Sequence, residues 1–259
     1  MYRPPPKGEI FIKQYFIKFP NKYIQCDIKK QFGISRKFYI TYILIDKYRS
    51  FENYSWITIK KIFEFYGYKT CKHKPKTFYE ILDILEYMIK EEMIEIVQDL
   101  DNISYDTGIE IKINSSKFDA PANFTKLTSH QLDYIWYSET SLNKENILIA
   151  FLYINSYIGC RKRKEDGTEF DDASNYPEAC WQSLDNMAQN LGMSKATMNQ
   201  CIDYLTSELE PLLIREKFYG IDEDNFQYNA PSIYVLNKEG YKKEVKWAIQ
   251  KMKEIYNKK

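Results

Sequence analysis

Five polar side chains lie close together in the sequence: Ser194, Lys195, Thr197, Asn199 and Gln200. The hydroxyl and ammonium groups can bind phosphate, whereas the amides of Asn199 and Gln200 can each form two hydrogen bonds to an adenine edge. Such groups suit the reading of duplex DNA if one structural element presents them on the same side. We therefore interpret these residues as a candidate DNA-binding set.

The surrounding sequence predicts a helix-turn-helix between Ser183 and Ile214. Gly192 would take the turn conformation that other residues resist, and Ser194 would cap the second helix. The apolar residues expected on the inner faces are Leu184, Met187, Ala188, Leu191, Met198, Ile202, Leu205 and Leu209. This arrangement would leave the outer side of the second helix available to a DNA major groove.

The same helices could instead serve only for contacts with other proteins. Asp203 lies one turn after Asn199, where DNA-binding helices often carry a cation. The turns expected at Asp99–Asn102 and Asp222–Asn225 are acidic and would be repelled by phosphate. If either half of the chain binds DNA, we expect its helix to make the contact and its hairpin tip to stay away.

A second candidate set is the basic loop between Gly67 and Thr77. Its lysines are Lys69, Lys72, Lys74 and Lys76. The loop would lie at the front of a helix and beside the groove, so it could contact phosphates. A merely solvated loop is the alternative. A further basic run at 161–164 is followed at once by Glu165 and Asp166, and we interpret it as solvated.

Metal and catalytic chemistry lack the patterns that they need. Cys71 and His73 are close in sequence, but no second close pair accompanies them, because Cys160 and Cys180 are far apart. The chain has two histidines and no arrangement of nucleophile, base and acid that can be argued from them. Neither phosphate-binding glycine motif, GxxxxGK[ST] or GxGxxG, occurs. We therefore expect a protein that is not an enzyme and has no cofactor or metal.

Composition sets the scale but not the partner. The chain has 259 residues, 44% of them hydrophobic, which is enough for one large domain or two modest ones. The net charge of +1 gives no overall case for nucleic acid. Residues 1–30 nevertheless carry seven cationic and two acidic side chains, and residues 241–259 carry the same numbers. Such basic ends can find DNA phosphates or simply increase solubility.

The sequence also suggests where the protein works. Its N-terminal segment lacks the apolar core of a signal peptide, and no run approaches the roughly 18 apolar residues of a membrane span. Five cysteines at irregular spacing indicate reduced thiols and no disulfide framework. We therefore expect a soluble cytoplasmic protein without membrane contact.

The order of predicted elements repeats along the chain. In the first half, we expect helices at Arg36–Tyr48, Thr58–Tyr66 and Thr77–Glu91, followed by strands at Met93–Val97 and Ile109–Ile113. The residues expected on the inner faces of the second and third helices are Ile59, Ile62, Phe63, Tyr66, Ile81, Leu85 and Met88. In the second half, we expect helices at Asn143–Ile158, Ser183–Leu191 and Lys195–Glu208, followed by strands at Leu212–Ile214 and Ser232–Leu236. Three helices and a hairpin are the winged-helix order. We predict a mainly α fold with small β-hairpins, built from tandem winged-helix units by internal duplication.

The predicted boundary lies near Ser115–Pro121, where both patterns break. Residues 1–118 would form a first winged-helix domain with a basic N-terminal arm, and residues 119–259 a second one with a C-terminal amphipathic helix. That helix is expected at Tyr241–Tyr256 and would bury Val245, Ala248, Ile249, Met252, Ile255 and Tyr256. It could pack on its own domain, or it could serve in dimerisation or contact with the DNA backbone.

Four segments of the second half resemble replication-initiator and replisome-organiser proteins of Gram-positive plasmids and phages, some of which are related to DnaD-type primosomal modules. The segments are Leu127–Ile135, Asn146–Ile158, Leu184–Leu205 and Leu212–Ile214. The first half matches only in element order. The resemblance implies double-stranded DNA binding in replication initiation of a mobile element, with replisome proteins and a second copy of the chain as further partners. A transcription regulator or a protein-interaction module is the alternative.

Overall fold

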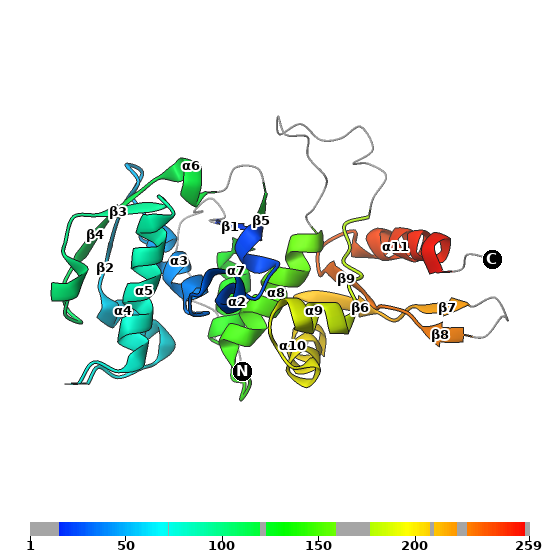
Figure 1. The fold of residues 1–259 in the computed structure, drawn as a ribbon. Coiled ribbons are helices and arrows are strands. Elements are labelled where there is room, and N and C mark those ends of the chain that lie inside the picture. The colour runs from blue at the N-terminus through cyan, green and yellow to red at the C-terminus, as the bar shows by residue number, and fades with distance from the viewer. Residues whose placement is uncertain are drawn as a thin grey trace. The chain divides into compact units, whose positions relative to one another are not determined.

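The computed structural model describes residues 16–71, 73–119, 123–158, 177–207, 210–221 and 227–256 (Figure 1). These residues fall into two compact units. The first unit comprises residues 17–20 and 28–119, and the second comprises residues 21–27 and 123–256. The short segment at 21–27 therefore belongs with the C-terminal half, although the sequence-based boundary placed it in the first domain.

The first unit contains short helices around one small sheet. Among its described residues the elements are β1 (Phe16–Pro20), α2 (Ile28–Phe32), α3 (Phe38–Lys47), β2 (Tyr54–Ile57), α4 (Ile59–Tyr66), α5 (Lys76–Lys90), β3 (Ile94–Ile96), a 3-10 turn (Leu100–Asn102), β4 (Ile109–Ile113) and α6 (Ser115–Phe118). The sheet is antiparallel with the order β2-β4-β3. The predicted hairpin is present as β3 and β4, and β2 is an additional strand that the sequence did not predict.

Helix α3 forms the centre of the first unit. Every residue from Phe38 to Asp46 is buried, which fits a helix enclosed by its neighbours. Tyr42 stacks on Phe118 with ring centroids 4.1 Å apart, and it lies 4.5 Å from the Phe19 ring. The inner faces predicted for α4 and α5 are confirmed by the burial of Ile59, Ile62, Phe63, Ile81, Leu85 and Met88. The prediction for Tyr66 was wrong, because its side chain is half-buried.

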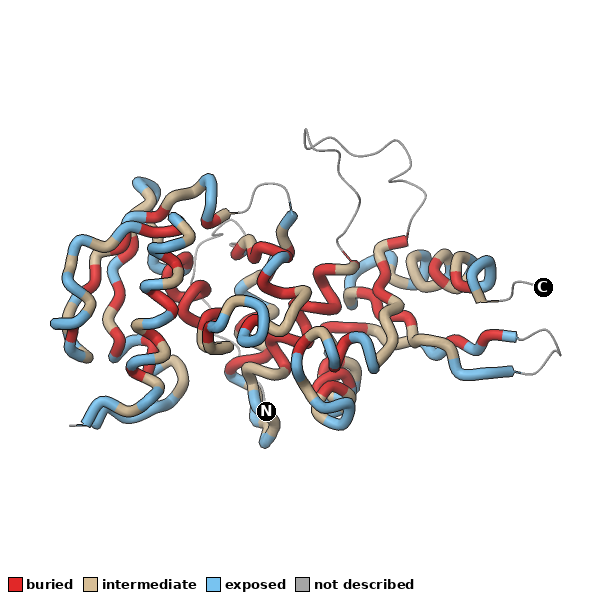
Figure 2. The backbone as a smooth tube through the Cα atoms, viewed as in Figure 1, coloured by how far each residue is buried: buried red, intermediate tan, exposed pale blue. Residues whose placement is uncertain are grey.

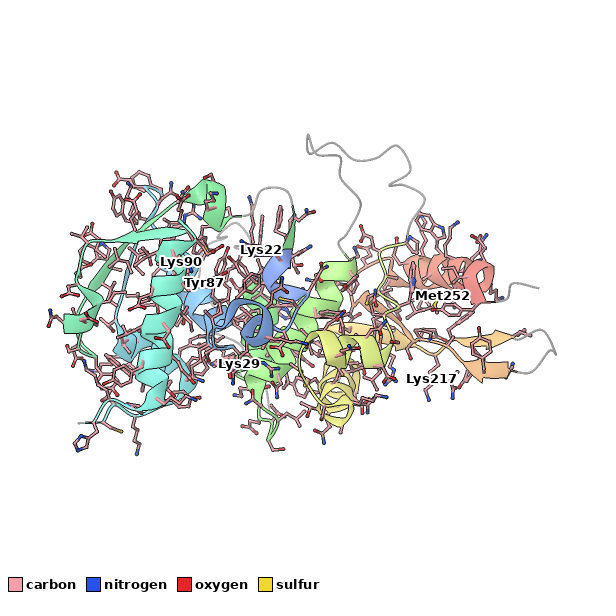
Figure 3. All side chains as sticks on the ribbon, in the orientation of Figure 1. Lys22, Lys29, Tyr87, Lys90, Lys217 and Met252 are labelled. Atoms are coloured by element: carbon pink, nitrogen blue, oxygen red, sulfur yellow. The ribbon has the colours of Figure 1, made fainter. Side chains whose placement is uncertain are left out.

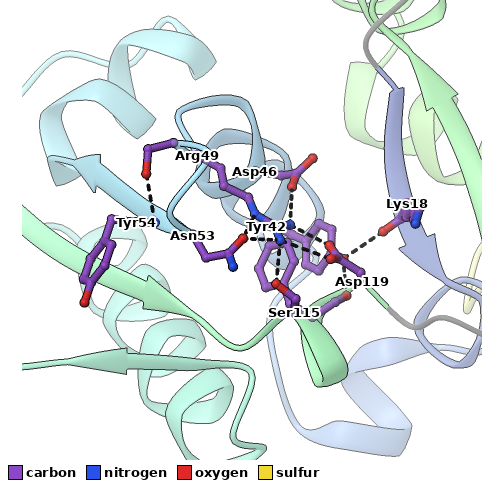
Figure 4. Close-up of polar contacts among 10 residues, drawn as sticks. Lys18, Tyr42, Asp46, Arg49, Asn53, Tyr54, Ser115 and Asp119 are labelled. Atoms are coloured by element: carbon purple, nitrogen blue, oxygen red, sulfur yellow. Dashed lines mark hydrogen bonds and ion pairs between the residues drawn. The ribbon is translucent and has the colours of Figure 1, made fainter.

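A polar network joins the end of α3 to α6 (Figure 4). The Arg49 guanidinium donates to Asp119 Oδ1 at 2.6 Å and to Asp119 Oδ2 at 3.1 Å, which is a bidentate pair. It also donates to Asn53 Oδ1 and, at 2.7 Å, to Ser115 Oγ. Asn53 has a φ of 66°, in the left-handed region that asparagine tolerates better than most residues. The network fixes the turn between α3 and β2.

The second unit contains two long helices, α8 and α11, among shorter helices and strands. Among its described residues the elements are α1 (Asn21–Ile24), β5 (Phe124–Thr128), α7 (Ser129–Trp136), α8 (Lys144–Ile158), α9 (Leu184–Asn190), α10 (Lys195–Ser207), β6 (Leu213–Glu216), β7 (Tyr219–Ile221), β8 (Gln227–Asn229), β9 (Ile233–Leu236) and α11 (Tyr241–Tyr256). Strand β6 pairs with β9, and β7 pairs with β8, both antiparallel. The acidic turn predicted at Asp222–Asn225 lies outside the described residues.

One further strand contact completes the sheet of the second unit. Tyr234 on β9 faces Arg215 of β6 in the register, and it also forms an antiparallel bridge to Cys180. Two backbone hydrogen bonds of 2.8 Å join Cys180 and Tyr234. Strand β9 therefore lies between β6 and the segment that precedes α9. The sequence predicted only the pair of strands β6 and β9 here.

Helix α8 forms the core of the second unit and is buried on all sides, as the red tube in Figure 2 shows. Helix α11 covers the β9 side of the sheet: Ala248 and Met252 are fully buried against Phe218, Ile233 and Val235. Figure 3 labels Met252 on this helix. The tail helix thus packs on its own unit, which was one of the two expected roles. Val245, Ile249 and Tyr256 are half-buried against the same cluster. Ile255 was also predicted to be buried, but it is 48% exposed and is not part of this cluster.

The fold class is confirmed at the coarse level, since helices outweigh strands and every paired strand of the small sheets above is antiparallel. Among the helices of the described residues, none combines the length and the apolar character that crossing a membrane requires.

Candidate nucleic-acid interface

Helices α9 and α10 occupy the positions of the two helices that the sequence predicted between Ser183 and Ile214. The Ser183 side chain caps α9 by accepting from the Asn186 amide, and Ser194 Oγ caps α10 by accepting from the Thr197 amide at 3.0 Å. Between the helices, Gly192 has a φ of 58°, the left-handed conformation that favours glycine. The Ser194 cap and the turn glycine were predicted from the sequence, whereas the Ser183 cap was not.

The turn is also packed against the segment at 21–27. A Cβ atom placed on Gly192 would lie 2.1 Å from the Asp27 carboxylate. That segment is held in the second unit by Gln25, which donates to Ser156 on α8, and by Asn21, which accepts from Thr125. Gly192 is therefore required for space as well as for backbone conformation.

The inner face of α10 is apolar and closed. Met198, Cys201, Ile202 and Leu205 are each no more than 2% exposed, which confirms the predicted face and adds Cys201 to it. Leu209 lies outside the described residues. In the same helix Lys195 and Gln200 are exposed and Asn199 is half-buried. The structure therefore brings the predicted set together at the N-terminal half of α10.

Two members of the set contribute mainly to the cap. Ser194 Oγ and Thr197 Oγ1 are 2.8 Å apart, and Ser194 Oγ already accepts the Thr197 amide. Ser194 is exposed and Thr197 is half-buried. Their hydroxyls hold the first turn in place, and the exposed one remains within reach of a ligand.

Lys195 forms an ion pair with Asp185 of α9. Its Nζ lies 2.6 Å from Asp185 Oδ1, and both side chains are about two-thirds exposed, at 66% and 62%. Exposed pairs of this kind contribute little to stability, on the order of 0–1 kcal/mol. The ammonium can therefore exchange Asp185 for a phosphate oxygen at small cost.

Asn199 and Gln200 differ in their surroundings. The Asn199 amide donates to Asp203 Oδ2 at 2.7 Å. Gln200 is exposed, and its side chain makes no hydrogen bond within the part of the chain that the structure describes. Gln200 is thus the more adaptable of the two amides, and Asn199 the more ordered.

Asp203 is paired with a cation that sequence reasoning missed. Arg215 on β6 donates to Asp203 Oδ1 at 3.2 Å and, through its Nε, to Ser232 Oγ at 3.4 Å. Lys217, labelled in Figure 3, follows β6 and is exposed. Arg215 lies in a different element from the predicted set, so only the packing of β6 against α10 shows that it is a neighbour of Asp203.

The basic loop of the first unit is partly used within that unit. Lys69, Lys74 and Lys76 are exposed, and Lys72 lies outside the described residues. The Lys74 ammonium donates to the Ile103 carbonyl at 2.8 Å and lies 4.5 Å over the Phe78 ring. Lys76 is 3.7 Å from Glu80.

The helix behind this loop carries acidic groups. Asp83 and Glu86 are exposed on α5. The outer face of α5 is therefore less suited to phosphates than that of α10.

The first unit also has an apolar hollow of about 250 Å³, lined by Tyr48, Trp56, Ile57, Thr58, Lys61 and Gly108. Trp56 is 61% exposed and Tyr48 is 40% exposed. Large aromatic side chains at the surface are common in protein interfaces. This hollow could not be predicted from local sequence patterns, because it depends on strand β2, which was not predicted.

The described cysteines are dispersed. Burial raises the pKa of the Cys180 thiol to about 12 and that of the Cys201 thiol to about 11, whereas Cys71 is exposed. Within the described ranges there is no group of three or more His, Cys, Asp or Glu side chains placed to hold a metal ion.

No protein-family model matches this sequence, and no curated protein matches it significantly.

Proposed function

We propose that both units are winged helices. In the first unit the order is α3, β2, α4, α5, β3 and β4, with β4 in the middle of the sheet. In the second unit the order is α8, the Cys180 bridge, α9, α10, β6 and β9, with β9 in the middle. Along the sequence, each set of elements is also preceded by a short strand that leads directly into a helix, β1 into α1 and β5 into α7, although α1 packs within the second unit. This repeated order supports duplication of one fold.

The second unit, in this proposal, binds double-stranded DNA through the outer face of α10. The observation that carries the proposal is the division of this helix. Its inner face is fully buried, and its N-terminal half carries the exposed Lys195 and Gln200 and the half-buried Asn199 behind a serine cap. A helix held in this way can enter a major groove without losing its packing. Lys195 would contact phosphate, and the two amides would contact base edges.

Two other elements of the second unit carry further positive charge. Arg215 and Lys217 lie at β6, and the exposed face of α11 carries Lys242, Lys243, Lys246 and Lys253. These side chains could add contacts with the DNA backbone that do not depend on sequence. The residues Asp222, Glu223 and Asp224 are acidic in sequence, so the proposal assigns no phosphate contact to them.

The process we propose is replication initiation of a plasmid, phage or other mobile element, with replisome proteins as partners. This step depends on the sequence resemblance of the second half. Transcription regulation is the alternative process for the same DNA-binding helix.

The second candidate function is a protein-interaction module. It is favoured by the first unit, where the hollow beside Trp56 and Tyr48 is apolar and the outer face of α5 is acidic. The two functions are compatible: α10 would bind DNA, and the first unit would contact another protein.

The test is a titration of the full chain with labelled AT-rich and mixed-sequence duplexes at several salt concentrations between about 50 and 200 mM. We expect binding that weakens as salt increases. Lys195→Ala should weaken binding to every duplex alike and lower the salt slope by roughly one, because one phosphate contact is lost. Lys47→Ala is the matched control, since Lys47 is an exposed lysine at the end of α3.

If the unaltered protein binds no duplex even at the lowest salt, the DNA-binding proposal is wrong. Helix α10 would then be a docking surface for another protein, and the lysine-rich tail would serve solubility.

A further inference from the structure

Three side chains at the interface form a chain of hydrogen bonds. Asn199 Nδ2 donates to Asp203 Oδ2 at 2.7 Å, and Arg215 donates to Asp203 Oδ1 at 3.2 Å. Asn199 and Asp203 are one helical turn apart on α10, and Arg215 comes from β6. The Asp203 carboxylate therefore accepts from the predicted base-contacting amide with one oxygen and from a cation with the other.

The Asp203 carboxylate determines the orientation of the Asn199 side-chain amide. An ionised carboxylate only accepts hydrogen bonds, so it attracts Nδ2 and repels Oδ1. With Nδ2 held toward Asp203, one of its two hydrogens is used there. The second hydrogen and Oδ1 then remain as one donor and one acceptor, which is the pair that an adenine edge requires. A guanine edge offers two acceptors at the equivalent positions and matches this fixed amide less well.

We infer that Asp203 is a positioning residue, which orients Asn199 for adenine and whose charge is neutralised by Arg215. The inference rests on the proposed DNA-binding function of α10. In this inference Asp203 contributes to base recognition through Asn199, although the negative charge of Asp203 by itself would repel DNA. Arg215 is the counter-ion: its side chain is 28% exposed and is steadied by Ser232, while Asp203 is 55% exposed.

The role of Arg215 is distinct from that of Asp203. Without the guanidinium, the Asp203 charge would face the DNA uncompensated, and every duplex would be repelled to the same degree. The amide of Asn199 would still be oriented. Loss of Arg215 should therefore lower affinity without changing base preference. Loss of Asp203 should reduce base preference without lowering the affinity for duplexes in general.

The experiment is a selection of bound duplexes from a random pool, carried out with the full chain and three variants. The unaltered protein should enrich adenine at one position. Asp203→Ala should reduce that preference by about 5- to 150-fold, the range expected for losing one bidentate contact, while total affinity stays equal or rises. Asp203→Asn should keep much of the preference, because its amide oxygen can still accept from Asn199. Arg215→Ala should weaken all duplexes and keep the preference.

Either of two results with an Asp203→Ala variant would overturn the inference. An Asp203→Ala variant with an unchanged thermal midpoint and an unchanged adenine preference would show that Asn199 needs no positioning. A loss of affinity for all sequences together with a lowered midpoint would show a purely structural role. If the unaltered protein binds duplexes without adenine preference, the inference fails while the proposed function stands. If it binds none, the proposed function fails as well.

Discussion

Gly192 illustrates how one residue joins backbone geometry to tertiary packing. Its φ of 58° is costly for residues with a Cβ, and the Asp27 carboxylate occupies the space that a Cβ would need. Gly67, which ends α4, has a φ of 71° but open space around it. The two glycines thus separate backbone strain from steric conflict.

We predict that Gly192→Ala destabilises the protein more than Gly67→Ala does. Backbone strain alone should cost roughly 1–2 kcal/mol at either position. At Gly192 the displacement of Asp27 adds to that cost, so Asp27→Ala should reduce the effect of Gly192→Ala in a double-mutant cycle. Denaturant midpoints provide the measurement. Equal losses at both glycines, with no coupling to Asp27, would contradict the packing described for the turn.

The pair of Arg49 and Asp119 gives a second prediction for single residues. Its geometry is bidentate, and the side chains are only 18% and 24% exposed. Asp119→Ala should therefore cost about 1.5–3 kcal/mol, as expected for lost hydrogen bonds to a charged group. The control is Glu95→Ala, which removes the partner of Lys112 from an ion pair that is 68% and 52% exposed, and which should cost less than about 1 kcal/mol. Urea denaturation measures the free energy of unfolding of both variants. Similar losses of stability would show that the Arg49 network stabilises the fold no more than an exposed ion pair does.

At the scale of the element, helical periodicity carried most of the correct predictions. Helices α4, α5, α10 and α11 begin and end within about two residues of the predicted bounds, because caps and apolar spacing are local properties. Strand β2 was missed since it is short and its exposed Trp56 interrupts the apolar pattern. A strand of this length depends on pairing with β4, which no local pattern reveals.

The candidate site could also be predicted only in part, because some of its contacts are local in sequence and others depend on tertiary packing. The outer face of α10 follows from periodicity, so Lys195, Asn199 and Gln200 could be predicted. The spacing of Asn199 and Asp203 was a readable signal for their hydrogen bond, since residues one turn apart on a helix are neighbours. Arg215 could not be predicted, because it reaches Asp203 only through the packing of β6. The attachment of residues 21–27 to the second unit is likewise a tertiary property.

Helix α10 yields a prediction at this scale. Leu205 is fully buried, so Leu205→Ala should cost roughly 2–5 kcal/mol through the cavity that it leaves. Gln200→Ala on the exposed face of the same helix should change stability by no more than about 0.5 kcal/mol. Thermal and denaturant midpoints test both variants. An unchanged midpoint for Leu205→Ala would mean that the two faces of α10 have been assigned the wrong way round.

For the whole molecule, the central claim is that one polar helix face in the second unit contacts duplex DNA. The near-neutral net charge of +1 means that overall attraction cannot account for binding, so the contact must be local. The claim assigns DNA contact to the second unit alone, because the corresponding helix α5 of the first unit exposes the acidic side chains of Asp83 and Glu86.

The most direct test is photo-crosslinking from defined positions of the full chain to a labelled AT-rich duplex. A photoreactive side chain replaces Gln200 on α10 in one variant and Lys47 on α3 in another; both positions are exposed. The account predicts a crosslink from position 200 that excess unlabelled duplex removes, and none from position 47. A crosslink from position 47 without one from position 200, or no crosslink from either, would contradict it.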